Sequence, residues 1–261
     1  HVSFPNSMVD RIAPSVGRAE RARANAQTGV EDETPVIGES FTRWVIEDEF
    51  IAGRPAFDQV GVQLRNDVEK FEAIKGRLLN ASHMMLSYPA LMCGYRVVDE
   101  ALRQPAIAAY LDAFMDKDVI PLLKGPDGVS LEDYKRQILE RFTNPAIGDQ
   151  LLRIAQNGIA KLPVFLSKTL SELLDRGGAF ERVALCLACF EHYLHGHDLQ
   201  GSTFPVDEPL MTTEDKALLQ SQDPLAVLRL SPFKALQLFA DDVFIKSFLK
   251  ARKHLASRGP V

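Results

Sequence analysis

From about residue 59 onwards, apolar side chains recur at the three-to-four-residue spacing of amphipathic helices. Val62, Leu64 and Val68 lead into a long helix predicted from about residue 66 to residue 87, which Pro89 kinks or ends. Further helices are predicted at about residues 91–103, 105–117, 130–142, 148–157, 163–175, 179–194, 213–220, 223–229 and 231–255. Strands and helices do not alternate here, so we predict that the bulk of the chain is all-α.

Three short motifs divide this helical region. The segment Gly125-Pro126-Asp127-Gly128 has the composition of a turn, and Gly177-Gly178 separates two helices. Asn144-Pro145 is expected to start a helix.

The first 55 residues lack the helical period. Residues 15–40 are polar and contain several Gly and Pro, which predicts an irregular connection with one or two helical turns near residues 19–26. Residues 44–50 are rich in strand-preferring side chains and are predicted to form a strand. One strand does not make a sheet, so either it pairs with residues 4–9 or its partners lie outside this chain.

Composition narrows the class of protein. The 261 residues are 46% hydrophobic and 25% charged, with a formal net charge of -5, which gives no electrostatic reason to bind nucleic acid. Three cysteines rule out a disulfide scaffold, and no apolar run reaches the ~18–20 residues of a membrane span. We expect a cytoplasmic protein without a signal peptide, and the first residue, His1, suggests a processed or truncated product.

One stretch of the long predicted helix carries four polar side chains that suit catalysis. At ~100° per residue, Glu72, Lys75, Asn80 and His83 share an arc of ~140°. They could simply form the solvated face of an ordinary helix. Alternatively, a partly buried lysine can act as a base and a neighbouring amide can donate to a developing alkoxide, which would make this an active-site helix.

Two further groups of polar residues could carry chemistry. If one helix continued through residue 158, a polar stripe would run along it, formed by Arg153, Asn157 and Lys161. Such a stripe would suit a polyhydroxylated or anionic ligand, or it would simply be a surface stripe. The series Cys186, Cys189, His192, His195 and His197 looks like a zinc site. Steps of three on a helix drift by ~60° each, so these side chains wind around the axis, and we expect no metal there.

Together these motifs resemble the long-chain mannitol dehydrogenase family. The resemblance is carried, in the family's order and over most of the chain, by Lys75-x4-Asn80-x2-His83 and by the supporting segments Phe4-Pro5-Asn6-Ser7-Met8-Val9-Asp10-Arg11-Ile12, Trp44-Val45-Ile46-Glu47-Asp48, Arg77-Leu78-Leu79-Asn80-Ala81-Ser82-His83, Arg141-Phe142-x-Asn144-Pro145 and Lys161-Leu162-Pro163.

The resemblance implies that residues 56–261 form the family's helical carboxy-terminal substrate domain, similar to that of 6-phosphogluconate dehydrogenases. Residues 1–55 would be an interdomain connection left with a strand that has no sheet. The NAD(P)-binding Rossmann domain, which would precede the Phe4 stretch and bind most of NAD or NADP, would be a covalently linked part that this chain lacks. The chain alone is therefore expected to be inactive.

The resemblance also implies a role for each site residue. Lys75 would be the general base, Asn80 half of an oxyanion hole, and His83 a ligand of substrate hydroxyls. Glu72 would relay protons to water, in a mechanism without a metal. The substrate-binding residues implied are Asp10, Arg153 and Lys161.

The expected activity is oxidation of a polyol, or reduction of a ketose or keto-sugar acid, and the residues do not choose among these substrates. The rival hypothesis is a non-catalytic helical interaction or regulatory module. A polar pocket joining the predicted residues favours the enzyme, whereas scattered exposure of their side chains favours the module. These residues are Asp10, Lys75, Asn80, His83, Arg153 and Lys161.

Overall fold

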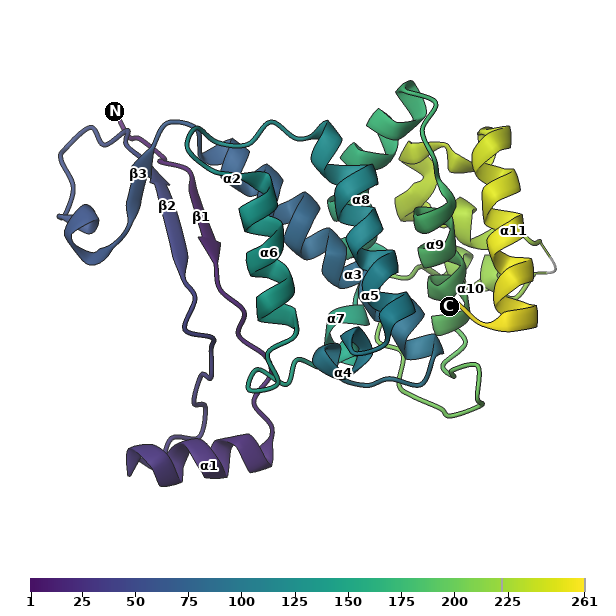
Figure 1. Ribbon diagram of the computed structural model, residues 1–261, viewed down its shortest axis with the longest axis horizontal. Helices are drawn as coiled ribbons and strands as arrows, with labels where there is room; N and C mark the ends of the chain where they lie inside the picture. Colours follow the sequence, from purple (N-terminus) through teal and green to yellow (C-terminus); the bar gives the residue numbers. More distant parts are fainter. Residues whose placement is uncertain (222, 261) are drawn as a thin grey trace.

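The computed structural model describes residues 1–221 and 223–260. A small sheet lies at one end of the molecule and a body of helices at the other (Figure 1). Helix α1 (Arg18–Thr28) stands apart from the helical body and has no buried residue. The prediction of a mainly helical protein with a short β-containing amino-terminal segment is confirmed.

The sheet has three strands in the order β1 (Ser7–Asp10), β2 (Arg43–Glu47) and β3 (Gln63–Arg65). β1 runs antiparallel to β2 and β3 runs parallel to it. The strand predicted at residues 44–50 thus pairs with the Phe4–Val9 region, and the expectation of a strand without a sheet is wrong. β3 went unpredicted because three residues carry too little alternation to be recognised.

The long helix predicted at residues 66–87 consists of α2 (Val68–Ile74), a π-helical turn (Lys75–Asn80) and α3 (Ala81–Met92). Pro89 does not end it, because a proline removes only one hydrogen bond and the buried apolar residues around it keep α3 packed. Almost every residue of α3 is buried, as expected for a helix that is covered on all sides. It is therefore the central helix of the body.

The remaining helices surround α3 or lie beyond it (Figure 1). A second π-helical turn spans Phe114–Val119, and a 3-10 turn spans Ile120–Leu122. The α-helices are α4 (Val98–Leu102), α5 (Pro105–Ala113), α6 (Leu131–Phe142), α7 (Leu151–Ala155), α8 (Gly158–Asp175), α9 (Glu181–Tyr193), α10 (Thr213–Leu219) and α11 (Asp242–Arg258).

Several predicted helix boundaries are wrong for identifiable reasons. The helix predicted over residues 231–255 is interrupted by the left-handed residue Gln237, and α11 begins where the Asp241 side chain caps the Phe244 N–H. Residues 226–229 form only a 3-10 turn. Asn144 accepts a hydrogen bond from the Ala146 N–H and closes a turn instead of starting a helix. The predicted turn at residues 125–128 is confirmed by the bond from Val129 N–H to Pro126 C=O.

A buried ion cluster ties the amino-terminal segment to the helices. Arg141 of α6 lies 2.7 Å from carboxylate oxygens of both Asp10 and Glu39. The Tyr134 hydroxyl donates to Asp10 at 2.7 Å, and the Ile12 N–H donates to Glu39 at 2.6 Å. The side chains of the three charged residues are at most 7% exposed. Buried charges are tolerated only when they are paired and hydrogen-bonded, and this condition is met here.

We predict that Arg141→Met lowers the free energy of unfolding by about 3–5 kcal/mol, because it leaves two buried carboxylates without their cation. Arg136→Met on the same helix is the matched control. The Arg136–Asp133 pair is exposed, so its loss should cost at most about 1 kcal/mol. Urea unfolding of both variants tests this, and equal effects would contradict the role given to Arg141.

Candidate functional site

The residues predicted to carry chemistry lie along the central helix. Glu72 lies in α2, Lys75 and Asn80 begin and end the π-helical turn, and His83 lies in the first turn of α3. In this turn the Ala81 N–H donates to the C=O of Gly76, five residues earlier. The π turn changes the angles predicted for a regular α-helix, because its hydrogen bonds join residues five apart instead of four.

His83 is held in a defined orientation. Its side chain is 12% exposed, and its ring stacks on Phe142 with centroids 4.0 Å apart. Its Nε2 is buried and has no hydrogen-bond partner among the described residues; the nearest carboxylate oxygen, of Asp149, is 4.0 Å away. Burial, with help from the nearby cations Arg153 and Arg141, lowers the pKa of His83 to about 3. The imidazole is therefore neutral at neutral pH and has a polar atom available for a ligand.

Asp149 connects this imidazole to a cation. It is buried, and its Oδ1 lies 2.6 Å from Nη2 of Arg153, one helical turn away. Asp149 was not predicted as a site residue, although its i,i+4 spacing from Arg153 is visible in the sequence. Burial lowers the pKa of Lys161, and the positive charge of the nearby Arg153 lowers it further. The Lys161 ammonium donates to the C=O of Ile154 at 3.0 Å.

The predicted stripe along one helix through Arg153, Asn157 and Lys161 is wrong. α7 ends at Ala155, Asn157 adopts a left-handed conformation with φ of 56°, and a new helix, α8, starts at residue 158. α8 runs on through Pro163 instead of ending near it. Arg153 and Lys161 nevertheless lie near each other, because the chain changes direction between α7 and α8 instead of continuing as one straight helix.

Glu208 fixes the start of α8. Its carboxylate accepts the N–H groups of Gly158 and Ile159, each at 2.8 Å, which places a negative charge where the helix dipole favours one. Residue 158 has to be glycine, because a Cβ there would lie 2.1 Å from the Tyr88 hydroxyl. The side-chain oxygen of Asn157 is buried without a partner among the described residues.

The structure thus brings His83, Arg153 and Lys161 into one polar cluster around Asp149. Arg141 links Asp10 to the same region, since its charge acts on His83. Lys75 and Asn80 have no side-chain hydrogen bond within the described part of the chain and are partly exposed. The neutral imidazole of His83 and the cations Arg153 and Lys161 can bind a molecule with several hydroxyl groups.

The Cys and His series does not converge. Cys186 and Cys189 are fully buried in the core, whereas His192 and His195 line a cavity between α9 and α11. Among residues 1–221 and 223–260, no group of three or more His, Cys, Asp and Glu side chains is placed to hold a metal ion. Across the same residues, each helix is too short or too polar to cross a membrane.

Comparison with known proteins gives two family matches. The mannitol dehydrogenase C-terminal domain matches residues 67–256, and the mannitol dehydrogenase Rossmann domain matches residues 1–59. Mannitol 2-dehydrogenase of Neosartorya fischeri is 38% identical over 261 residues, which cover 98% of this chain and 52% of that protein. The polyol:NADP oxidoreductase of Gluconobacter oxydans is 38% identical over 233 residues, or 89% of this chain and 48% of that protein. The chain spans about half the length of these curated relatives.

Solved structures agree with these matches. Mannitol 2-dehydrogenase of Pseudomonas fluorescens, in a ternary complex with NAD and D-mannitol, superposes with a TM-score of 0.91 and 37% identity, covering 100% of this chain and 53% of that one. A substrate-free D-sorbitol dehydrogenase gives a TM-score of 0.88 at 35% identity, covering 99% of this chain and 53% of that one.

The low pKa of His83 predicts a pH-dependent stability. Between about pH 6.5 and 3 the unfolded chain binds a proton at this position that the folded chain refuses, so stability falls as the pH falls through this window. In His83→Gln, the free energy of unfolding should drop by roughly 2 kcal/mol less between about pH 7 and about pH 4.5 than in the wild type. Denaturant unfolding at both pH values measures this.

The matched control is His254→Gln, because that side chain is exposed on α11. It should leave the pH dependence of stability as in the wild type. If the free energy of unfolding fell as much with pH in His83→Gln as in the wild type, this result would contradict a neutral, buried imidazole at this position.

Proposed function

The chain belongs to the mannitol dehydrogenase family, and from this premise we propose that it is the catalytic and substrate-binding part of a polyol or sugar-acid dehydrogenase that uses NAD or NADP. Residues 56–261 would be the substrate domain, and residues 1–55 would connect it to the rest of a Rossmann domain. The names of its relatives, which include mannitol 2-dehydrogenases and a D-sorbitol dehydrogenase, support a polyol as the substrate class.

One observation carries this proposal: a neutral imidazole nitrogen is buried without a partner beside two cations. An unsatisfied buried polar atom costs free energy, and a ligand hydroxyl at His83 Nε2 would remove that cost. The position of His83 one turn from Asn80, on a rigid buried helix, is what a catalytic constellation requires.

In the proposed reaction Lys75 accepts the proton of the substrate hydroxyl while hydride leaves the same carbon. A nicotinamide cofactor, when bound, supplies the acceptor for that hydride. Asn80 donates its amide N–H to the oxygen as negative charge develops on it. Glu72 is exposed and lies three residues before Lys75 on the helix, so it can pass the proton to water. No step requires a metal, because the lysine acts as the base.

The remaining residues hold the substrate. His83 contacts hydroxyls next to the reacting carbon, and Arg153 and Lys161 bind the more distant ones. Arg141 and Tyr134 reach the Asp10 carboxylate with three hydrogen bonds, and a carboxylate accepts about four. One acceptor position on Asp10 therefore remains for a substrate hydroxyl.

The chain's own residues fit only part of a cofactor site. Its sequence contains no G-x-G-x-x-G segment, which is the loop that cradles the cofactor phosphates in Rossmann domains. We therefore propose that residues outside this chain bind most of NAD or NADP, and that residues 1–261 alone are inactive.

Lys75→Ala should lower kcat of the complete enzyme by at least ~100-fold, because it removes the general base. Added primary amines should restore part of the activity. Lys70→Ala is the matched control, since Lys70 lies on the same helix with its side chain 38% exposed and should be dispensable. Steady-state rates of mannitol oxidation measure both. Near-normal turnover in Lys75→Ala would remove this residue from its proposed role.

Asn80 and His83 should differ in their kinetic effects. Asn80 stabilises charge that exists only in the transition state, so Asn80→Ala should lower kcat by ~10²-fold or more with little change in KM. His83 also binds ground-state hydroxyls, so His83→Ala should raise KM and lower kcat less. Steady-state kinetics of both variants decide this, and the reverse pattern would exchange the two roles.

A further inference from the structure

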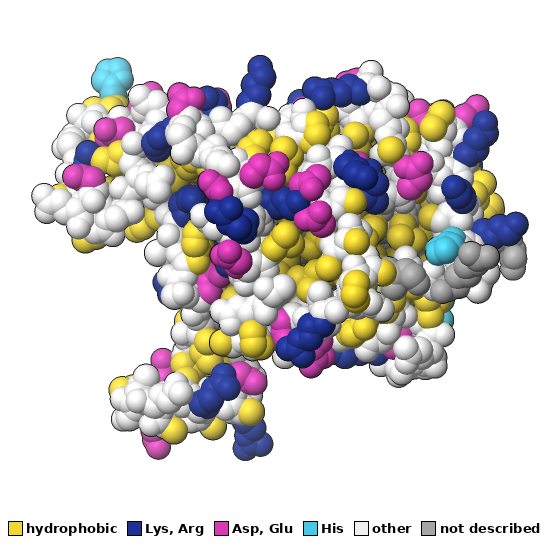
Figure 2. Space-filling model, in the orientation of Figure 1, with side chains coloured by type: hydrophobic (Ala, Val, Ile, Leu, Met, Phe, Trp, Pro, Cys, Tyr) yellow, Lys and Arg dark blue, Asp and Glu magenta, His cyan; other side chains and the backbone are white. Residues whose placement is uncertain are grey.

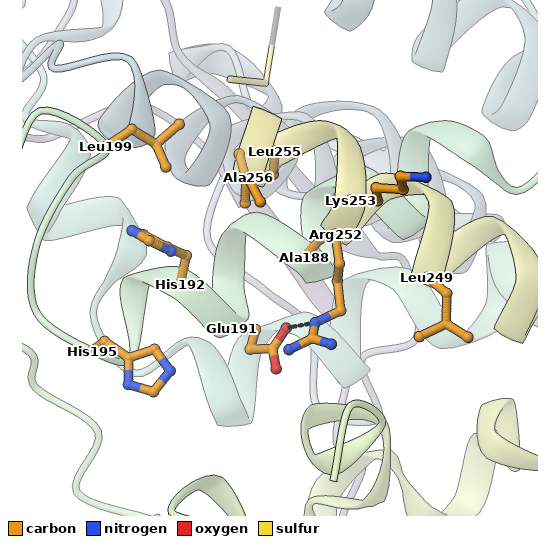
Figure 3. A pocket seen from close by; sticks show the side chains of 10 residues that line it. All are labelled: Ala188, Glu191, His192, His195, Leu199, Leu249, Arg252, Lys253, Leu255 and Ala256. Atoms are coloured by element: carbon orange, nitrogen blue, oxygen red, sulfur yellow. Dashed lines mark hydrogen bonds and ion pairs between the residues drawn. The ribbon is translucent and has the colours of Figure 1, made fainter. Parts of the chain in front are cut away.

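A cavity lies between α9 and α11. It has a volume of about 460 Å³, within the range of small-molecule sites. α9 and the turn after it form one wall, α11 forms the other, and Leu199 lies at one end (Figure 3). None of the residues proposed for catalysis or polyol binding lines it.

The polar groups of this cavity are arranged to receive a negative charge. Arg252 donates through Nε to Glu191 at 2.6 Å, which orients the guanidinium but uses only one of its five N–H donors. Its two terminal nitrogens have no acceptor within the described part of the chain. Figure 3 shows this pair in the middle of the cavity, with Lys253 on the same helix. Two cations against one carboxylate leave the lining with one net positive charge.

The cavity lining includes another polar side chain with an atom that has no hydrogen-bond partner among the described residues. Nε2 of His192 is buried without a hydrogen bond among the described residues, and the His192 ring meets that of His197 edge-on with centroids 4.7 Å apart. A buried nitrogen in this state favours a ligand that hydrogen-bonds to it.

Apart from His195, the rest of the lining is apolar. It consists of Ala188 of α9, Leu199 of the segment after α9, and Leu249, Leu255 and Ala256 of α11. The chain as a whole has a net charge of -5, yet Lys250, Arg252 and Lys253 lie close together in α11. Figure 2 shows Lys and Arg side chains gathered at this end of the molecule.

We propose that the cavity between α9 and α11 binds a small organic carboxylate with an apolar body. The carboxylate pairs with the free nitrogens of Arg252, because the planar guanidinium matches it in shape and charge. The apolar body lies against Leu249 and Leu255. A single negative charge matches the net charge of the lining, which favours a carboxylate over a doubly charged phosphate.

Octanoate is the probe, titrated calorimetrically into the complete protein, with 1-octanol and inorganic phosphate as controls for the two halves of the ligand. Octanoate should bind saturably at one site, more tightly than either control, and saturating mannitol should leave its affinity unchanged. Absence of saturable binding, equal binding of phosphate, or displacement by mannitol would each overturn the proposal.

Three variants locate the site. Arg252→Ala should weaken octanoate binding about tenfold or more, as expected for a lost hydrogen bond to a charged group. Leu249→Glu should weaken it similarly through charge repulsion, and because Leu249 is 38% exposed this variant should fold normally. Lys246→Ala, a charge removed from the same helix outside the cavity, should bind octanoate normally. Wild-type affinity in Leu249→Glu would overturn the proposed location.

Discussion

The burial of Arg141 between two carboxylates is the constraint on which the arrangement of this chain depends. Asp10 and Glu39 reach it from the amino-terminal segment, over a hundred residues away in sequence, and neither charge would be tolerated in the interior without it. The next residue, Phe142, stacks on His83. The end of α6 therefore fixes the position of the sheet on one side, through Asp10 of β1, and the orientation of the His83 imidazole on the other.

The chemistry that this arrangement permits comes from polar atoms that the fold does not satisfy. Most buried polar groups are hydrogen-bonded, as Asp149 and Glu208 are. His83 Nε2 and Asn157 Oδ1 are among the exceptions in the part of the chain that the structure describes. The π turn between α2 and α3 is a further irregularity in this region. It changes the directions of side chains on a helix whose position is otherwise fixed by packing. Under the proposed function, these are the places where stability is given up for binding and catalysis.

The helical character of the chain and the location of Lys75, Asn80 and His83 on one long helical segment could be predicted from the sequence. The pairing of β2 with the amino-terminal segment was only one of two alternatives that the sequence left open. Periodicity reports which residues are buried, and it is strong in long helices such as α6 and α9. The π turn could not be predicted, because six residues are too few for its hydrogen-bonding pattern to be recognised from the spacing of apolar side chains. The left-handed residue Asn157 was missed for a similar reason: Glu208 and Tyr88, which stabilise the break, are distant in sequence. The partners of Arg141 and His83 are likewise long-range contacts that spacing does not reveal.

The most direct test is a crystal structure of the complete protein with NAD or NADP and a polyol bound. We expect the polyol to lie against the central helix, with one hydroxyl within hydrogen-bond distance of Lys75 Nζ and Asn80, and a neighbouring hydroxyl on His83 Nε2. Arg153 and Lys161 would bind its far end. A polyol bound elsewhere, with Lys75 beyond reach of any hydroxyl, would contradict the assignment of this helix as the catalytic element.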